Sequence, residues 1–263
     1  GLIAQLWYTR DTRSSKPNPL DEVKSLIFYL DILYRNVYND LISDPDIIKG
    51  SSNFNISFGS WVGADKDGNP FVTTKITKEA LKIYSNQIIS IYKEKIIELS
   101  DDFSVSTNFV YCPDILERRI KNYSILLKKE FDHYSKVNFD EPFRIFLSLV
   151  FHRLENFQQN NKGYNSFNEF LEDMEIFQNS VNEVFGKNFR ISKLDDFVDY
   201  VKQFEFHGVA LDIRQNSSVI NSKKGKIYKD FINLIKEIPE LQNIYGQKVF
   251  NSIILSMTKS HQD

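Results

Sequence analysis

The sequence has one cysteine, ten glycines and seven prolines, and it lacks any long hydrophobic run. Cys112 alone excludes an internal disulfide framework and a cysteine-based zinc site, so we expect a reducing, cytoplasmic location. No apolar run approaches the roughly 18 to 20 residues that a membrane-spanning helix needs. A signal-peptide pattern is also absent, and we expect no membrane partner.

The chain also lacks a strong charge of either sign. Its 33 basic and 35 acidic residues give a net charge of -2, so nothing in the composition favours nucleic acid or an anionic membrane as partner. With 263 residues, 41% of them hydrophobic, the chain can bury a sizeable core. Because it begins on Gly1 without a methionine and stops directly after a strand-like run, we expect a piece of a larger polypeptide.

Apolar residues recur every three and four positions over most of the chain, as amphipathic helices require. The pattern predicts the tail of a helix over 1–8 and helices over 20–43, 77–99, 113–134, 141–156, 166–185, 192–203, 227–238 and 241–245. Three short β-prone runs, over 54–61, 209–215 and 252–257, predict strands that each follow a helix. The expected fold class is therefore mostly α with a few parallel β-strands.

One stretch, residues 58–73, concentrates special backbone and charge. Gly59, Gly63 and Gly68 lie in it, and its charged run 65–67 falls on a predicted strand-to-helix loop. Such loops carry function when the strands form a parallel sheet or barrel, because the catalytic face lies at the carboxyl ends of the strands.

The spacing of Asp65, Asp67 and Asn69 suggests the start of a calcium loop. That interpretation fails, because Pro70 stands where the loop needs glycine and Ile76 where it needs a bidentate glutamate. A phosphate-binding Walker loop is excluded as well, since no Gly-Lys-Ser/Thr closes the stretch. The remaining alternative is a glycine-bearing turn with solvated charges that enters a helix.

A second stretch, residues 204–217, alternates with period two. Val209, Leu211 and Ile213 face one way, and residues 212, 214 and 216 (Asp, Arg and Asn) face the other. Such a strand belongs either to a sheet half open to water or to a barrel in which the charged side chains point into a site.

These two motifs, Gly-Ser-Trp-Val-Gly-Ala-Asp-Lys-Asp-Gly-Asn-Pro at 59–70 and Leu-Asp-Ile-Arg-Gln-Asn at 211–216, resemble those of the phosphoenolpyruvate carboxylase family. The segments 11–22, 141–144, 153–154 and 253–258 resemble further parts of that family, so the resemblance spans nearly the whole chain. It implies that residues 1–263 are one region, a partial domain holding about three of the eight strands of a helix-rich (β/α)8 barrel.

The resemblance also implies an activity, a cofactor and partners. Family members join phosphoenolpyruvate to bicarbonate through carboxyphosphate and an enolate, giving oxaloacetate and phosphate with Mg²⁺, typically as allosteric tetramers. The family's catalytic histidine segment precedes the matching region, and its metal ligands and glycine-rich loop follow it. None of the four histidines here has the matching context. We therefore expect these residues alone to be inactive and to bind no metal tightly.

Carried over by motif, Arg214 is the expected catalytic residue, which contacts the phosphate and the developing charge. A structural arginine paired with Asp212 is the alternative. Trp61 is expected to wall the substrate pocket, with an ordinary core tryptophan as the alternative. Gln215 is expected at the substrate site, where it orients Arg214 or a carboxylate.

Lys66 is the third expected substrate-binding residue, whereas Asp65, Asp67, Asn69 and Asp212 are expected to organise the loop and the basic groups around it. The chain departs from the family pattern at two of its positions. Lys66 stands where the family commonly has arginine, which keeps the charge but loses the bidentate fork. Glu205 stands where glycine is usual.

Two other functions stay open at this point. The chain could belong to a diverged relative that kept the scaffold and serves as a binding or assembly subunit. It could also be a free-standing helical interaction module, although such a scaffold has no evident need for the charged strand around Arg214.

Overall fold

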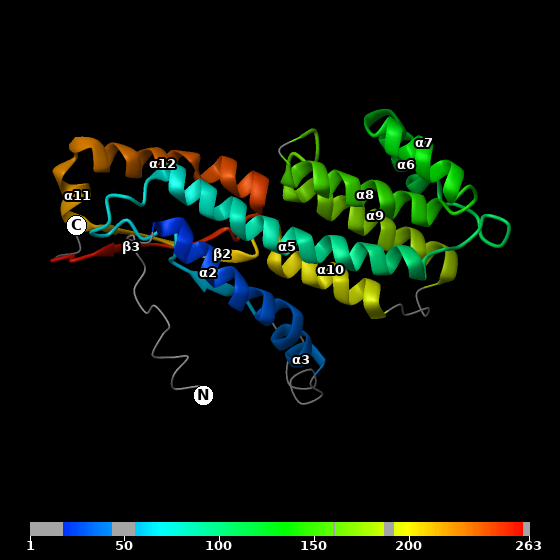
Figure 1. The fold of residues 1–263 in the computed structure, drawn as a ribbon, viewed down its shortest axis with the longest axis horizontal. Coiled ribbons are helices and arrows are strands. Elements are labelled where there is room, and N and C mark those ends of the chain that lie inside the picture. The colour runs from blue at the N-terminus through cyan, green and yellow to red at the C-terminus, as the bar shows by residue number, and fades with distance from the viewer. Residues whose placement is uncertain (1–17, 44–55, 160, 187–191, 260–263) are drawn as a thin grey trace, which may run out of the picture.

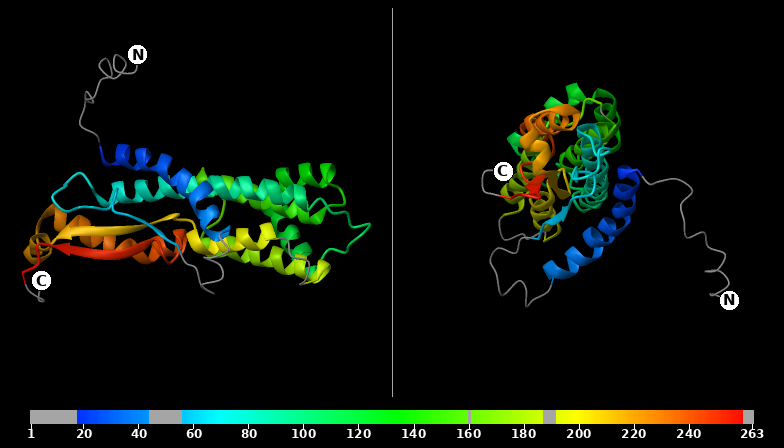
Figure 2. Two further views of the ribbon diagram at one scale, coloured as in Figure 1. Left: turned by 90° about the horizontal axis from the view of Figure 1, so that it is seen from below. Right: turned by 90° about the vertical axis from the view of Figure 1, so that its left-hand side faces the viewer.

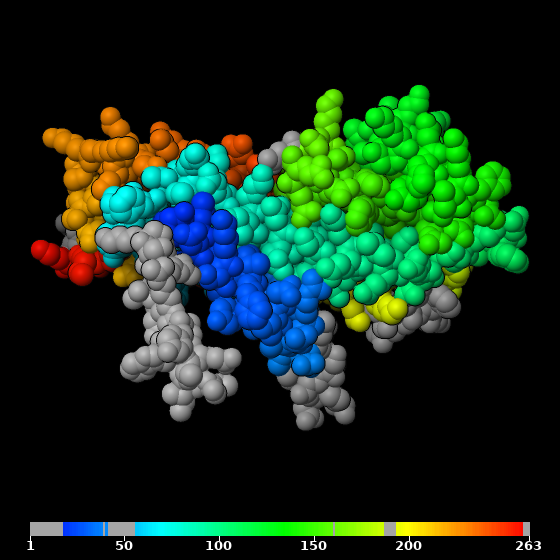
Figure 3. All heavy atoms as spheres, viewed as in Figure 1, coloured from blue at the N-terminus to red at the C-terminus, as the bar shows by residue number. Residues whose placement is uncertain are grey.

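The computed structural model describes residues 18–43, 56–159, 161–186 and 192–259. The molecule is elongated, with a small sheet at one end and a bundle of helices at the other (Figure 1). The long helix α5 (Thr74–Asp102) runs along both parts and packs against α2 (Pro19–Ile32) and α8 (Pro142–Gln158). Figure 3 shows the side chains of α2 lying against those of α5 on one face.

The remaining elements continue or surround these helices. After α2 the chain continues as a π-helical stretch, η1, and a further helical segment, α3. The other bounds are η1 Leu33–Val37, α3 Tyr38–Ser43, α6 Asp114–Leu126, α7 Lys128–Val137, α9 Phe167–Phe185, α10 Ser192–Phe204, α11 Ser217–Ser222 and α12 Gly225–Tyr245.

The sheet has three parallel strands in the order β1-β2-β3: β1 Phe58–Ser60, β2 Val209–Asn216 and β3 Phe250–Ser256. Figure 2 shows β2 and β3 side by side, with their carboxyl ends together at the tip of the molecule near α11. The prediction of a mostly helical fold with three parallel strands is confirmed. Two positions of the first predicted strand, 54 and 55, and the helix tail predicted over 1–8 lie outside the described residues.

Two predictions about where a helix is interrupted were wrong. The helix predicted over 113–134 is two helices, because Leu127 leaves helical geometry (φ -121°, ψ 54°) and is buried between α6 and α7. The break predicted near residue 239 is absent, and α12 continues through Pro239. Pro239 is exposed, so water can satisfy the one carbonyl that loses its helical donor.

The start of α5 also differs from the prediction, which placed it at residue 77. Thr73 is the N-cap, and its side-chain oxygen accepts a hydrogen bond from the backbone N–H of Ile76. The helix therefore begins one turn earlier, directly after the glycine-rich stretch. This shortens the loop between β1 and α5 and fixes its end.

The core joins the sheet to the helices through aromatic rings. Phe206, in the turn between α10 and β2, is fully buried. Its ring centroid lies 4.9 Å from that of Phe157, 5.3 Å from that of Phe170 and 5.7 Å from that of Phe167. These contacts fix the point at which β2 begins.

Glu205, beside this turn, adopts a left-handed backbone conformation with φ 47°. That conformation favours glycine, so a glutamate adopts it at a cost in backbone strain. The buried carboxylate accepts a hydrogen bond from the backbone N–H of Lys248 at 3.0 Å, and the carbonyl accepts one from the Tyr92 hydroxyl at 2.6 Å. These bonds offset the strain of the non-glycine residue.

None of the helices in the described parts of the chain is both long and apolar enough to span a membrane.

The central position of Phe206 leads to a stability prediction. Phe206→Ala should lower the free energy of unfolding by about 3 to 5 kcal/mol, because it removes a fully buried ring and leaves a cavity. Phe139→Ala is the matched control: Phe139 is 84% exposed, and its loss should change stability by less than about 0.5 kcal/mol. Urea unfolding followed by circular dichroism measures both, and equal effects of the two substitutions would contradict the assigned role of Phe206.

Candidate functional site at the carboxyl ends of the strands

The loop between β1 and α5 lies against the carboxyl end of β2 and extends its hydrogen-bonding pattern. The backbone N–H of Arg214 donates to the carbonyl of Ala64 at 3.2 Å, and the N–H of Lys66 donates to the carbonyl of Arg214 at 2.8 Å. Asp65 and Arg214 thus form a parallel bridge beyond the end of β1. Two motifs about 150 positions apart in sequence are held together by backbone hydrogen bonds.

Glycine makes the sharp bend of this loop possible. Gly63 has φ 91°, and a Cβ placed on it would lie 2.5 Å from the Cβ of Ala80 in α5. Gly68 also has positive φ, at 68°, but a Cβ there would meet no atom within 4 Å. The loop therefore approaches α5 closely at Gly63 and only needs a turn at Gly68.

Asp67 connects this loop to two strands. Its carboxylate accepts hydrogen bonds from the Ser256 hydroxyl of β3 at 2.6 Å and from the Asn216 amide of β2 at 3.2 Å. One guanidinium nitrogen of Arg214 lies 3.5 Å from it. The Ser256 hydroxyl, the Asn216 amide and the Arg214 charge lower the pKa of Asp67, so the carboxylate is ionised at neutral pH.

Arg214 is held at this end of the sheet but stays open to solvent. Its side chain is 46% exposed, and besides Asp67 it faces an oxygen of Asp65 at 4.0 Å. Both distances are long for ion pairs, so the guanidinium keeps donors available for an added anion. The alternative pairing with Asp212 is not observed: Asp212 accepts hydrogen bonds from Asn251 at 3.1 Å and Ser252 at 2.5 Å, which join β2 to β3.

Trp61 lies at the start of the same loop and is 63% exposed, so the alternative of an ordinary core tryptophan is wrong. Its carbonyl accepts from the N–H groups of Ala64 and Asp65, both at 2.9 Å. Asn69 folds the far side of the loop, since its side-chain oxygen accepts from the N–H of Phe71 at 3.2 Å. A loop-organising role for Asn69 and Asp67 stays a prediction, and both side chains make hydrogen bonds of the kind that it requires.

Lys66 points away from this open end. It is 4% exposed, and its ammonium donates to the carbonyl of Val72 at 2.8 Å and to Asp230 of α12 at 2.9 Å. Burial lowers the pKa of Lys66, and the nearby Asp230 carboxylate opposes that shift. Asp230 also accepts from the N–H of Thr74, the first residue of α5. A substrate-binding role for Lys66 stays a prediction, and the contacts indicate that it anchors the loop to two helices.

Gln215 is almost fully buried on the face of β2 opposite to Arg214. Its side-chain oxygen accepts from the N–H of Asn216 at 2.8 Å, and its side-chain nitrogen has no hydrogen-bond partner among the described residues. The expectation that Gln215 orients Arg214 or contacts substrate is not supported by a direct contact, and it also stays a prediction.

Two residues of this site were missed from the sequence. Ser256 could have been found, because it lies near the end of the strand predicted over 252–257, and parallel strands end at the same edge of a sheet. Asp230 gives no such signal, since it lies 164 positions from Lys66 within an amphipathic helix. A salt bridge across that separation depends on how α12 packs.

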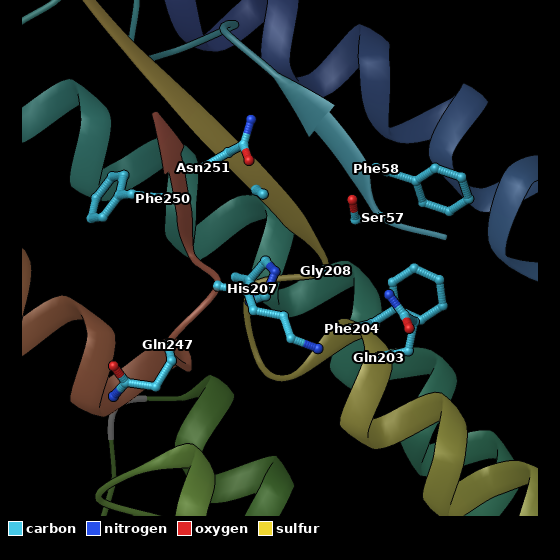
Figure 4. Close-up of a pocket in the computed structure, with 11 residues that line it drawn as sticks. Ser57, Phe58, Gln203, Phe204, His207, Gly208, Gln247, Phe250 and Asn251 are labelled. Atoms are coloured by element: carbon cyan, nitrogen blue, oxygen red, sulfur yellow. The ribbon is translucent and has the colours of Figure 1, made fainter. Parts of the chain in front are cut away.

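A pocket of about 330 Å³ lies at the opposite, amino ends of the strands (Figure 4). It includes Ala210, on the same face of β2 as Arg214, together with Phe58, Gln203, His207 and Asn251. His207 is 2% exposed, and its Nδ1 lies 3.4 Å from a carboxylate oxygen of Glu205. Ligands bind outside the carboxyl ends of the strands in open parallel sheets as well as in barrels, so we favour the Arg214 end as the functional site.

Comparisons with known proteins agree with the motif at this end. A family model described as phosphoenolpyruvate carboxylase matches residues 1–230. The phosphoenolpyruvate carboxylase of Nostoc sp. is 30% identical over 254 residues, covering 88% of this chain and 24% of that protein. Those of Trichormus variabilis and Aromatoleum aromaticum are 30% and 27% identical, covering 88% and 82% of this chain. The chain spans about a quarter of the length of these relatives.

The loop geometry predicts different effects at its two positive-φ glycines. Gly63→Ala should lower the free energy of unfolding by about 2 to 4 kcal/mol, the sum of left-handed strain and a clash with Ala80. Gly68→Ala should cost only the strain, about 1 kcal/mol. Thermal unfolding of both variants measures the difference, and a Gly68→Ala effect as large as that of Gly63→Ala would show that the approach to α5 is not tight.

Proposed function

The chain belongs to the phosphoenolpyruvate carboxylase family, and from this premise we propose that it is part of an enzyme that joins phosphoenolpyruvate to bicarbonate and releases oxaloacetate and phosphate. The premise removes the alternative of an unrelated helical module. We also propose that the three strands are a slice of a (β/α)8 barrel. Their parallel order and the position of Arg214 at a carboxyl end support this.

The exposed guanidinium of Arg214 is the observation that carries the proposal. Attack of bicarbonate on the phosphoryl group forms carboxyphosphate and leaves an enolate, so the site must hold several negative charges close together. Arginine suits this task, because its planar donors match phosphoryl and carboxyl oxygens and its charge persists at every working pH. Asp65 and Asp67 hold Arg214 from one side and leave its other donors open.

Trp61 supports the proposal through its place on the loop that holds Arg214. Its exposed ring can form a wall of the substrate site, as the family motif implies. Lys66 and Gln215 are buried, so in this proposal they support the loop and the strand and do not contact substrate. Asp212 and Asn69 have the same supporting role, the first between strands and the second within the loop.

The family implies a divalent metal cofactor, and we propose Mg²⁺ bound by ligands outside the described residues. Within residues 18–43, 56–159, 161–186 and 192–259, no group of three His, Cys, Asp or Glu side chains could hold a metal ion. Asp65 and Asp67 are two carboxylates that face Arg214, which makes them a poor fit for a metal. When bound, the metal would supply positive charge to the reacting oxygens.

We further propose that the complete polypeptide is a cytoplasmic, allosteric homotetramer that serves to replenish oxaloacetate. These properties rest on family membership alone. The competing proposal, a diverged binding or assembly subunit, requires a folded but inactive protein.

Oxaloacetate formation tests the role of Arg214 in the complete polypeptide that contains this chain, with phosphoenolpyruvate, bicarbonate and Mg²⁺. Arg214→Lys should lower kcat by at least roughly a hundredfold, because lysine keeps the charge and loses the planar donors. Arg118→Lys is the matched control on the exposed surface of α6 and should leave kcat unchanged. A folded wild type without activity would favour the diverged subunit, and an active Arg214→Lys variant would remove Arg214 from the chemistry.

The carboxylate that holds Arg214 gives a second prediction. Asp67→Asn keeps an oxygen for the Ser256 hydroxyl but removes the charge that faces Arg214, so kcat should fall by about tenfold, less than in Arg214→Lys. Ser256→Ala of equal stability is the control for an effect on the fold, and it should retain full kcat. If Asp67→Asn also retains full kcat, Asp67 acts only on the fold and the prediction is wrong.

The 263 residues expressed alone should show no oxaloacetate formation, because they span about a quarter of the relatives. Measurable turnover by these 263 residues that is reduced in their Arg214→Lys variant would contradict the proposal that essential groups lie elsewhere.

A further inference from the structure

A pocket of about 260 Å³ lies among helices, away from the sheet and from Arg214. Three elements and one loop form it: α5, the last turns of α8 and α12, and the loop between α8 and α9. The residues that line it are Lys82, Ser85, Asn86, Phe157, Asn161, Tyr164, Asn165, Ile244 and Tyr245. Nothing in the proposed carboxylase chemistry uses these residues.

One face of α5 supplies the polar side of the pocket. Lys82, Ser85 and Asn86 are spaced at i, i+3 and i+4, so their side chains lie together on that face. Ser85 is fully buried, and its hydroxyl has no hydrogen-bond partner among the described residues. An unpaired buried hydroxyl costs stability, so an added ligand that bonds to it recovers that cost.

Lys82 is the one charged side chain that lines the pocket. It is half-buried, and in the described part of the chain it has no carboxylate within ion-pair distance and no hydrogen-bond acceptor. Lys93, a half-buried lysine on the same helix, differs in this respect, because its ammonium lies 3.6 Å from a carboxylate oxygen of Glu155. A single uncompensated positive charge is complementary to a ligand with a single negative charge.

The other walls are apolar or amide-bearing. Phe157, Tyr164 and Tyr245 contribute rings and Ile244 an aliphatic side chain, whereas Asn161 and Asn165 are exposed at the rim. The volume is below that of most pockets for drug-sized ligands, so the fit is to a compact molecule. The hydroxyl of Tyr164 donates a hydrogen bond to Asp173 at 2.6 Å, so Tyr164 contributes only its ring surface to the pocket.

We propose that this pocket binds a small organic monoanion, a carboxylate whose charge pairs with Lys82, whose oxygen accepts from Ser85, and whose apolar body lies against the aromatic walls. The proposal is independent of the carboxylase assignment. A competing explanation exists for Lys82: α8 and α12 both end beside the pocket, and helix C-termini carry partial negative charge that a lysine stabilises.

The test measures binding of benzoate, pentanoate and neutral benzamide to the complete polypeptide by calorimetry and ligand-detected NMR. Benzoate or pentanoate should bind at least roughly tenfold more tightly than benzamide, because hydrogen bonds to charged groups are the stronger ones. A preference between the two acids distinguishes an aromatic from an aliphatic body. Equal binding of benzoate and benzamide, or no binding of either acid at about 10 mM, overturns the proposal.

Three variants separate binding from folding. Lys82→Gln should remove the preference for the acid, whereas Lys75→Gln, an 84% exposed lysine on the same helix, should leave it unchanged. Ser85→Ala should weaken binding several-fold while stability is retained or increased, because the unpaired buried hydroxyl is removed. If Lys82→Gln lowers stability but leaves acid binding unchanged, Lys82 only stabilises the helix ends and the proposal is wrong.

Discussion

The site depends on one carboxylate that serves three segments of the chain. Asp67 comes from the loop after β1 and bonds to Asn216 at the end of β2 and Ser256 at the end of β3. Because a carboxylate accepts several hydrogen bonds at once, one side chain sets the relative positions of two strand ends and a loop. Arg214 is placed by this arrangement, with its guanidinium 3.5 Å from Asp67 and open on its other side. The strand ends thus hold Arg214 in position without any bound ligand.

The sequence predicted the parts of the fold that follow from local patterns. The strand at 209–216 was evident from its period-two alternation, and most helices from their apolar spacing. The errors have local physical causes: Leu127 breaks a helix while it stays buried in the core, and Pro239 does not end α12 because its lost hydrogen bond falls on an exposed surface. The sheet order and the β1–α5 loop bridge to Arg214 needed the tertiary structure, since backbone pairing between distant segments leaves no residue pattern.

The same division holds for the site. The sequence motifs placed Asp67 and Asn69 in a loop and Arg214 in a strand. The structure brings Arg214 and Asp67 together. Residue types did not show whether Lys66 lies at an exposed site or in a buried salt bridge, because a charged side chain in a loop is equally compatible with both. Its partner Asp230 comes from α12, so the direction of the lysine was decided by packing. Lysine suits this contact, which needs a single point charge.

The outer edge of β3 has a consequence for handling the protein. In the described sheet β3 is paired on one side only, and Ile253 and Ile254 are 48% and 42% exposed. An unpaired strand edge offers backbone donors and acceptors to any other extended segment, and apolar side chains beside it strengthen that pairing. An edge of this kind that stays uncovered therefore favours edge-to-edge association of two chains. Solubility on expression therefore reports whether this edge of β3 is covered.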